Sequence, residues 1–409
     1  MSDQASERPL QTLLVANRGE IARRIFATAR TMGLSCVAVY SDADADAPFV
    51  VDADMAVHLP TGYLDGDAIV AAAMRAGADA IHPGYGFLAE NGAFAQSVMD
   101  AGLTWVGPSP AVIETMGDKI AAKKAAEAAG VPTLQSSEDA ADAESVGFPL
   151  LVKAAAGGGG KGMRLVERAD DLDDAIAAAQ REAVGAFGDD RIFLERYVRR
   201  SRHIEIQILG DSHGRIIHLG ERECSIQRRH QKIVEEAPSV RLDDDLRQTI
   251  GSAAVSLAQS IGYESAGTVE FLLDDESGEF FFLEVNTRLQ VEHPVTEAVT
   301  GLDLVRQQLL VASGHKLGVD QSDVAATGHA IEVRLYAEDA ANGFLPATGT
   351  VEAWSRPDEP AVRWDSGIEV NTVVGVSYDP MLAKVIAHGP TRVETIGRLT
   401  LALERLHVG

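Results

Sequence analysis

A predicted β-hairpin centred near Ser277 carries side chains that could bind a divalent metal ion. Glu270 and Glu284 each lie seven positions from Ser277, so they face one another across the two apolar strands that flank the turn. Asn286 follows Glu284 by two positions and therefore points to the same face of its strand. Carboxylate and amide oxygens without cysteine or histidine are typical of a magnesium ion held together with substrate phosphates. Glu270, Glu284 and Asn286 are the predicted metal ligands, and the alternative is an outward polar face on an edge hairpin.

The same alternation of side chains continues beyond the predicted metal ligands. If the chain stays extended after Asn286, the side chains of Arg288, Gln290 and Glu292 point into one cleft with them. This would place a guanidinium group and a general base beside the metal ion. The alternative interpretation is a salt bridge between Arg288 and Glu292. His293 precedes a proline, and we interpret it as a packing residue rather than a catalytic one.

A run of four glycines at 157–160 is predicted to bind phosphate. It lies between the apolar strand Leu150–Lys153 and the strand Met163–Val166. Glycines expose backbone N–H groups and allow phosphate oxygens to approach closely. Gly162 stands where a P-loop needs serine or threonine, and a strand replaces the helix, so the pattern indicates a flap that closes over a nucleotide. The alternative is a flexible linker.

Basic side chains are scarce in this chain, which makes their positions informative. Lys153 ends an apolar strand, where a solvated ammonium group is unusual, so a ligand phosphate is its expected counter-charge. Lys119 lies in a helical stretch and could equally be solvated. The segment Glu221–Glu236 concentrates further basic groups between acidic ones. An anionic substrate explains that concentration better than a solvated face does.

Strand and helix patterns divide the chain into three predicted domains. In the first, short apolar strands alternate with helical segments, which predicts a Rossmann-like parallel sheet with helices on both faces. An alanine-rich helical stretch at 111–130 leads to the strands around the glycine run, and the chain after His203 is rich in strands. The predicted fold class is α/β, with α+β character after the first domain. The domains are 1–115 with the parallel sheet, 116–200 as a small lid with a linker helix, and 201–409 as a larger strand-rich domain.

Composition restricts the partners and the location. The 409 residues carry 61 Asp and Glu against 36 Lys and Arg, and a net charge of −25 repels nucleic acid and anionic membranes. No apolar run approaches the length needed to cross a bilayer. Two cysteines provide neither a disulfide framework nor a zinc motif, which fits a reducing cytoplasm. We therefore expect a cytoplasmic protein that does not bind nucleic acid or a membrane.

Together the motifs resemble the biotin carboxylase family of the ATP-grasp superfamily, as found in the alpha subunits of acyl-CoA carboxylases. The resemblance covers essentially the whole chain, and the blocks follow the family's order and spacing. They are Ala16–Ala22, His82–Asn91, the glycine run, Gln227–Pro238 and Glu284–Glu297.

The resemblance implies a ligase that carboxylates biotin on a carrier protein with ATP and bicarbonate. In the family, ATP and bicarbonate form carboxyphosphate, which breaks down to carbon dioxide, and the deprotonated ureido nitrogen of biotin attacks that carbon dioxide. The implied cofactors are ATP and Mg²⁺, with Mn²⁺ as an alternative ion, and biotin is the carrier-borne substrate. The implied partners are bicarbonate, a biotin carboxyl carrier domain, a carboxyltransferase subunit and a second copy of the chain in a homo-oligomer.

The resemblance also assigns roles to residues at matching motif positions. Lys232, Arg288, Gln290 and the backbone of Val291 would hold bicarbonate, Glu292 would be its base, and Arg334 would stabilise the biotin enolate. Taken from the residues alone, Arg334 in an apolar strand needs a counter-anion, which could be Glu332 or Glu338. The segment 195–198 would lie near the adenine. The implied ATP-binding residues are Lys119, Lys153, Gly159, Gly160, Glu195, Arg196, Tyr197, Val198, His203, Gln227, His230, Glu270 and Glu284.

Several alternatives remain open at this stage. Family members continue beyond the position of Gly409, so the last domain is expected to be truncated, and no Met-Lys-Met biotinylation tripeptide is present. The chain could be the first part of a pyruvate carboxylase, or another ATP-grasp ligase such as carbamoyl phosphate synthetase. A non-catalytic subunit that kept the fold is a third alternative. The sequence does not identify the final acceptor of the carboxyl group.

Overall fold

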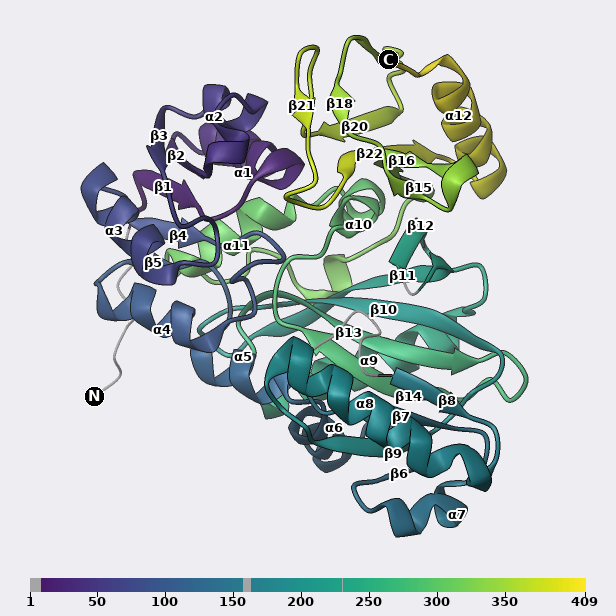
Figure 1. Cartoon of the computed structure of the whole chain (residues 1–409). Coiled ribbons are helices and arrows are strands. Elements are labelled where there is room, and N and C mark those ends of the chain that lie inside the picture. The colour runs from purple at the N-terminus through teal and green to yellow at the C-terminus, as the bar shows by residue number, and fades with distance from the viewer. Residues whose placement is uncertain (1–8, 157–162, 230) are drawn as a thin grey trace.

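The computed structural model describes residues 9–156, 163–229 and 231–409. Three larger sheets built from residues 12–105, 136–196 and 201–389 follow one another along the chain (Figure 1). The predicted α/β class, with its parallel N-terminal sheet, small lid sheet and large strand-rich part, is confirmed. The division into domains at residues 115 and 200 stays a prediction.

The N-terminal sheet is parallel and has the strand order β3-β2-β1-β4-β5. Leu13, Leu14 and Val15 of β1 are fully buried, as expected for a strand covered on both faces. Helix α1 packs with Leu13 on one face, and α3 and α4 pack with Leu14 on the other, so the predicted two-sided cover is confirmed. The elements are β1 Thr12–Val15, α1 Gly19–Thr31, β2 Ser35–Tyr40, α2 Pro48–Asp52, β3 Met55–His58, α3 Gly66–Ala76, β4 Ala80–His82, α4 Gly92–Asp100 and β5 Thr104–Trp105.

The helical stretch that follows is divided into α5 (Pro110–Gly117) and α6 (Lys119–Ala128). The break is at Asp118, whose Oδ1 accepts the N–H groups of Ile120 at 3.0 Å and Ala121 at 2.9 Å and so caps α6. Lys119 is the first residue of α6, and its N–H donates to the carbonyl of Ala155 at 3.0 Å. The cap and this backbone hydrogen bond therefore hold the backbone of Lys119 beside Ala155, which follows β7 and precedes the glycine run.

The lid is a four-stranded sheet of order β6-β9-β7-β8 that α7 and α8 accompany at the bottom of Figure 1. Strands β7 and β8 pair antiparallel and flank residues 157–162, so the predicted strands on both sides of the glycine run are confirmed. The glycines themselves, including Gly159 and Gly160, lie outside the described residues. The elements are β6 Ser136–Ser137, α7 Ala143–Val146, β7 Leu150–Ala154, β8 Met163–Val166, α8 Leu172–Phe187 and β9 Ile192–Arg196.

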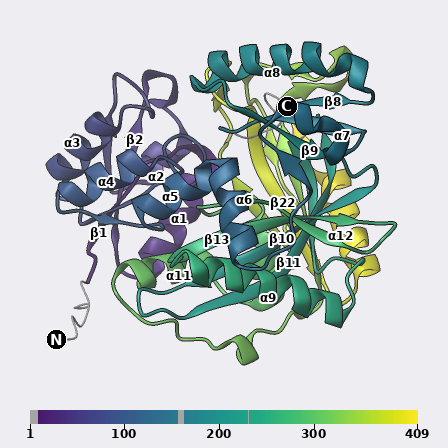
Figure 2. The same cartoon turned by 90° about the horizontal axis from the view of Figure 1, so that it is seen from below.

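The large sheet is antiparallel throughout, with the order β14-β13-β10-β11-β12-β15-β22-β20. The view in Figure 2 shows α9 and α11 lying along one side of its strands. Helix α10 contacts β12, β15 and β22 in the middle of the sheet. The elements are β10 Ser201–Gly210, β11 Ile216–Arg228, β12 Gln231–Ala237, α9 Asp244–Ser260, β13 Ser265–Asp274, β14 Phe280–Asn286, α10 His293–Thr300, α11 Leu304–Ala312, β15 His329–Tyr336, β20 Val362–Ser366, β22 Met381–Gly389 and α12 Arg392–Arg405.

Short paired strands complete the C-terminal part. They are β16 Glu338–Asp339 with β17 Leu345–Pro346, β18 Gly349–Thr350 with β21 Val373–Val374, and β19 Trp354–Ser355 with β23 His407–Val408. Among the described residues, none of the helices combines the length and apolar composition that crossing a bilayer requires.

Candidate active site

The hairpin of β13 and β14 has the register that the sequence predicted. Glu270 pairs with Glu284, and Thr268 pairs with Asn286. The three predicted metal ligands therefore share one face of the sheet. The expectation that two carboxylates face one another is confirmed.

The Glu270 carboxylate is the centre of a buried hydrogen-bond network. Its Oε1 accepts from Lys232 Nζ at 2.8 Å, Asn286 Nδ2 at 2.8 Å and Gln290 Nε2 at 2.7 Å. Burial alone would raise its pKa, but the Lys232 ammonium and His203 hold it well below the ordinary value. Glu270 is thus ionised and already neutralised by protein cations.

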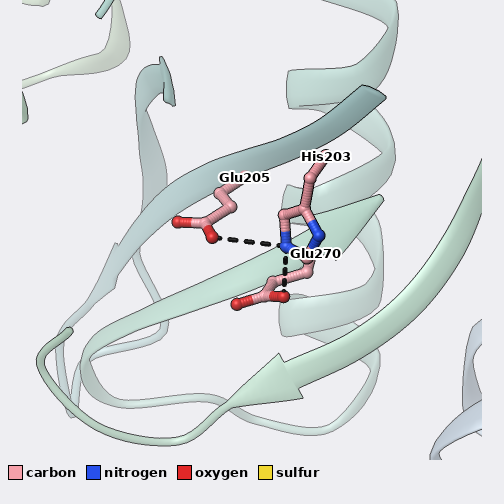
Figure 3. A group of neighbouring side chains, drawn as sticks. All are labelled: His203, Glu205 and Glu270. Carbon is pink, nitrogen blue, oxygen red and sulfur yellow. Dashed lines mark hydrogen bonds and ion pairs between the residues drawn. The ribbon is translucent and has the colours of Figure 1, made fainter. Parts of the chain in front are cut away.

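His203 and Glu205 of β10 and Glu270 of β13 form a compact group (Figure 3). The His203 Nε2 atom lies 2.5 Å from Glu270 Oε2 and 3.3 Å from Glu205 Oε1. Burial opposes protonation of the imidazole, but Glu270 and Glu205 raise the pKa of His203 to about 10. With a protonated His203 and with Lys232 bonded to both carboxylates, these three residues alone lack the negative charge that a metal ion requires, and a further carboxylate is needed.

The carboxylate of Glu284 is better suited to bind a magnesium ion than the group of His203, Glu205 and Glu270 is. Within the described part of the chain, its half-buried carboxylate has no hydrogen-bond or ion-pair partner. Burial and the facing Glu270 raise the pKa of Glu284, and the Lys119 ammonium lowers it. A hard cation between two facing carboxylates would relieve this repulsion. Asn286 directs Oδ1 to Arg288 and its amide nitrogen to Glu270, so its role as a third ligand stays a prediction.

Glu292 lies between two cations. Its Oε1 accepts from Lys232 Nζ at 2.8 Å and its Oε2 from an Arg334 nitrogen at 3.1 Å. Glu292 as a whole is 2 % exposed. Burial would raise its pKa, but Lys232, Arg334 and Arg222 hold the pKa of Glu292 below its usual value. An ionised carboxylate at neutral pH is the state that a general base requires.

Arg334 finds a counter-anion that the sequence did not identify. Its Nε donates to Glu235 Oε1 at 2.7 Å, and its second partner is Glu292. Glu338 instead pairs with Arg228, and both oxygens of the fully buried Glu332 lack a hydrogen-bond partner. The alternative partners Glu332 and Glu338 are therefore not the ones that Arg334 contacts, because β12 lies beside β15 and places Glu235 opposite Glu332, on the face of β15 that carries Arg334.

The chain does not stay in a strand after Asn286. Strand β14 ends there, and Arg288 turns to the N-terminal part, where its Nε donates to Glu90 Oε2 at 2.9 Å. The alternative salt bridge between Arg288 and Glu292 is not formed. Arg288 nevertheless stays beside the predicted metal ligands through its 2.9 Å bond to Asn286 Oδ1.

Arg222 was not among the residues predicted from the sequence, and it organises the base of the site through its hydrogen bonds. It is completely buried and donates to Gln207 at 2.7 Å, Thr268 at 3.0 Å and Thr296 at 3.0 Å, and also to Glu205 and Gln290. The side chain of Gln290 is thereby held between Arg222 and Glu270. The alternation of polar residues that starts at His203 could have indicated Glu205 and Gln207 as residues of the site. Arg222 could be assigned to the site only from the pairing of β10 with β11.

Lys153 is placed differently from the expectation. Its Nζ donates to Glu195 Oε2 at 2.8 Å, and Lys123 donates to the other oxygen at 3.0 Å. Glu195 is opposite Leu151 in the β7–β9 pair, so it shares a face with Lys153. Lys153 therefore has a buried carboxylate as a counter-charge within the protein, and its contact with a ligand phosphate stays a prediction.

The remaining predicted nucleotide-binding residues lie at the lid and at the β11 strand end. The N–H groups of Arg196 and Tyr197 donate to the carbonyls of Gln135 at 2.9 Å and Pro149 at 3.1 Å, which fixes the segment leading to Val198. Gln227 is exposed near the end of β11. His230, like Gly159 and Gly160, lies outside the described residues.

Three family models match most of this chain. Residues 9–113 match the family model "Biotin carboxylase, N-terminal domain", residues 118–319 match "Carbamoyl-phosphate synthase L chain, ATP binding domain", and residues 332–409 match "Biotin carboxylase C-terminal domain". Biotin carboxylase 2 of Bacillus subtilis is 48% identical, over 97% of this chain and 92% of that protein. The chain belongs to the biotin carboxylase family.

Solved biotin carboxylases have the same fold. The Campylobacter jejuni enzyme, solved as a complex with β,γ-ATP, has a TM-score of 0.95 and 42% identity, covering 98% of this chain and 92% of that one. The biotin carboxylase domain of Hydrogenobacter thermophilus 2-oxoglutarate carboxylase, a dimer with MgADP, ADP and bicarbonate, also has a TM-score of 0.95, with 42% identity and 98% and 91% coverage.

Longer carboxylase subunits are equally similar to the chain. The mitochondrial methylcrotonoyl-CoA carboxylase subunit alpha of Arabidopsis thaliana is 49% identical over 100% of this chain. The chain spans 58% of that protein's length. A biotin carboxylase sequence of this kind therefore occurs both as a separate protein and as part of a larger subunit.

Proposed function

We propose that this chain carboxylates biotin with ATP and bicarbonate, as the first half-reaction of an acyl-CoA or pyruvate carboxylase. The observation that carries the proposal is the position of Glu292 between Lys232 and Arg334. The carboxylate is buried, ionised and within 3.1 Å of two cations. These cations can bind an anionic substrate while the carboxylate takes its proton.

In the first step, Glu292 removes the proton of bicarbonate, and a bicarbonate oxygen attacks the γ-phosphorus of ATP to give carboxyphosphate and ADP. Lys232, Arg288, Gln290 and the N–H of Val291 hold the bicarbonate. Lys232 reaches three carboxylates and Arg288 reaches Glu90, so both cations are oriented before substrate arrives. Preoriented cations stabilise the charge that develops on the transferring group.

The magnesium ion that accompanies ATP would be held by Glu270 and Glu284, with Asn286 as a third ligand, and would neutralise phosphate charge. Mn²⁺ has the same preference for oxygen ligands. Lys119, Lys153 and the glycine run would contact the phosphates. His203, Gln227, His230 and the segment 195–198 would complete the nucleotide site.

In the second step, carboxyphosphate breaks down to phosphate and carbon dioxide. The ureido nitrogen of biotin loses its proton to the phosphate and attacks the carbon dioxide. Arg334 would stabilise the negative charge on the ureido oxygen. Its guanidinium is positioned for this by Glu235, which accepts from Nε and leaves a terminal nitrogen beside Glu292.

The proposal is tested by ADP release from purified protein with free biotin. We expect release that requires both bicarbonate and biotin. Release that responds to ammonia and not to biotin would support the alternative ligase of the carbamoyl phosphate synthetase type. No release under any condition, from protein that binds ATP, would support the non-catalytic alternative.

The partners follow from the same proposal. A carrier domain would present biotin, a carboxyltransferase subunit would choose the final acceptor, and the chain would form a homo-oligomer. We keep the cytoplasm as the proposed location because both cysteines are buried and unpaired. The plant relatives are named as mitochondrial proteins. The names of the relatives give several different carboxyl acceptors, so the proposal includes neither that location nor a particular acceptor.

A further inference from the structure

Two buried residues hold successive carbonyl groups of the loop that precedes α10. The His293 Nδ1 atom lies 2.7 Å from the carbonyl oxygen of Gln290, and Lys384 Nζ donates to the carbonyl oxygen of Val291 at 2.8 Å. Both side chains have no exposed surface. Neither residue has a role in the reaction proposed above.

These two side-chain bonds help to fix where the N–H groups of the loop point, together with the backbone N–H of His293, which donates to the Gln290 carbonyl at 3.3 Å. A trans peptide group is planar, so its C=O and its N–H point to opposite sides. Holding the Gln290 carbonyl toward His293 turns the N–H of Val291 away from His293. Holding the Val291 carbonyl toward Lys384 likewise turns the N–H of Glu292 away from Lys384. Within the described residues, neither N–H donates to a protein acceptor.

The His293 ring makes one side-chain hydrogen bond within the described residues, to the loop. A carbonyl oxygen only accepts, so Nδ1 must carry the proton. Its Nε2 is buried without a hydrogen-bond partner, and the nearest carboxylate oxygen, on Glu297, is 3.8 Å away. Burial, with Lys384, Arg24 and Arg363, holds the pKa of His293 well below its usual value, so the ring is neutral. Its one side-chain hydrogen bond is to the Gln290 carbonyl.

Lys384 connects the loop to the strand that carries Arg334. The two residues are direct register partners in the β15–β22 pair. Lys384 Nζ also lies 3.3 Å from Glu20 and 3.8 Å from Asp365, so its charge is compensated inside the protein. The shortest of these contacts is the bond to the Val291 carbonyl, which makes Lys384 an anchor for the loop.

We infer that His293 and Lys384 are positioning residues that keep the carbonyls of Gln290 and Val291 turned away from bound bicarbonate. The inference rests on the proposed function for the identity of the anion. If either peptide group rotated, a carbonyl oxygen would face the anion in place of an N–H donor. His293 therefore acts through the Val291 N–H and does not touch the substrate.

The test compares His293→Leu with His293→Asn. Leucine fills the site without a donor, whereas the asparagine amide nitrogen can replace Nδ1. We expect His293→Leu to raise the KM for bicarbonate roughly tenfold or more, with the KM for ATP within about twofold of the parent. His293→Asn should recover most of the bicarbonate affinity. His218→Leu is the control, because His218 is also buried with an unpartnered Nε2 but lies on β11.

Titration of each protein with bicarbonate by calorimetry separates this inference from the proposed function. A parent protein that binds bicarbonate but releases no ADP would refute the function alone. The inference is overturned if His293→Leu binds bicarbonate as the parent does, if His293→Asn fails to recover affinity while folding normally, or if the parent binds no bicarbonate. Equal increases in both KM values would also contradict it, because they would indicate a general structural effect.

Discussion

The Lys232 ammonium lies 2.8 Å from Oε1 of Glu292 and equally close to Oε1 of Glu270. One cation therefore joins the proposed base to the proposed metal site. The contact with Glu292 also lowers the pKa of the base, second only to the opposing effect of burial. The protonation state of Glu292 therefore depends on Lys232, which lies on β12 and not in the loop that carries Glu292.

Replacing Lys232 should change the pH dependence of the reaction. In Lys232→Met, the pKa of Glu292 rises because burial is no longer opposed by the ammonium group. The base then becomes protonated at a higher pH, so the acidic limb of the kcat/KM profile for bicarbonate moves to higher pH. Lys124→Met, at an exposed lysine, should leave the profile unchanged. An unshifted acidic limb in Lys232→Met would show that Glu292 is not the titrating base.

Removing the charge of Glu284 should weaken the use of magnesium. Glu284→Gln is expected to raise the magnesium concentration needed for half-maximal ADP release and to lower turnover, because one of the two facing carboxylates is lost. The measurement is a magnesium titration at fixed ATP. Glu276→Gln, in the exposed turn of the same hairpin, is the matched control. The metal assignment fails if both variants respond to magnesium as the parent does.

Arg222 should matter for stability more than any single predicted site residue. Arg222→Met leaves the buried Glu205 without one of its cations, and removal of one partner from a buried ion pair costs about 3–5 kcal/mol. Urea unfolding should show this decrease in the free energy of unfolding. Arg306→Met, at an exposed arginine of α11, should be neutral. A change below about 1 kcal/mol for Arg222→Met would contradict its structural role.

Glu332 should make the protein less stable as the pH rises. Burial and the nearby Glu235 and Glu292 raise its pKa well above the ordinary value, against the opposing charges of Lys384 and Arg334. A group with a raised folded pKa contributes stability that is complete below the unfolded pKa and is lost as the pH rises toward the folded pKa. Glu332→Gln should therefore lose less stability than the parent between about pH 5 and pH 8.

The measurement for Glu332 is the melting temperature at both ends of that pH range. Glu352→Gln, at an exposed position, provides the control for loss of one negative charge. Parallel curves for Glu332→Gln and the parent would show that Glu332 does not titrate in this range.

Local patterns predicted the parts of the site that lie on one hairpin. Counting from the turn was sufficient to pair Glu270 with Glu284, because an antiparallel register follows from the turn position. The parallel N-terminal sheet followed in the same way from alternating strands and helices. The motif blocks that resemble biotin carboxylases assigned the rest of the function.

Partners that come from distant segments could not be predicted. Glu90 reaches Arg288 from the N-terminal part, and Glu195 reaches Lys153 through the β7–β9 pair. Glu235 holds Arg334 because β12 lies beside β15. Each pairing depends on tertiary packing, and the spacing of residues along one segment contains no information about it.

The most direct test of the account is the rate of bicarbonate- and biotin-dependent ADP release in Glu292→Gln, measured together with ATP affinity. Loss of a general base lowers a rate by roughly 10²–10⁴-fold. We predict a decrease of that size with ATP affinity within about twofold of the parent, since Glu292 has no proposed contact with the nucleotide. Near-normal release by Glu292→Gln would contradict the central claim that Glu292 is the base that deprotonates bicarbonate.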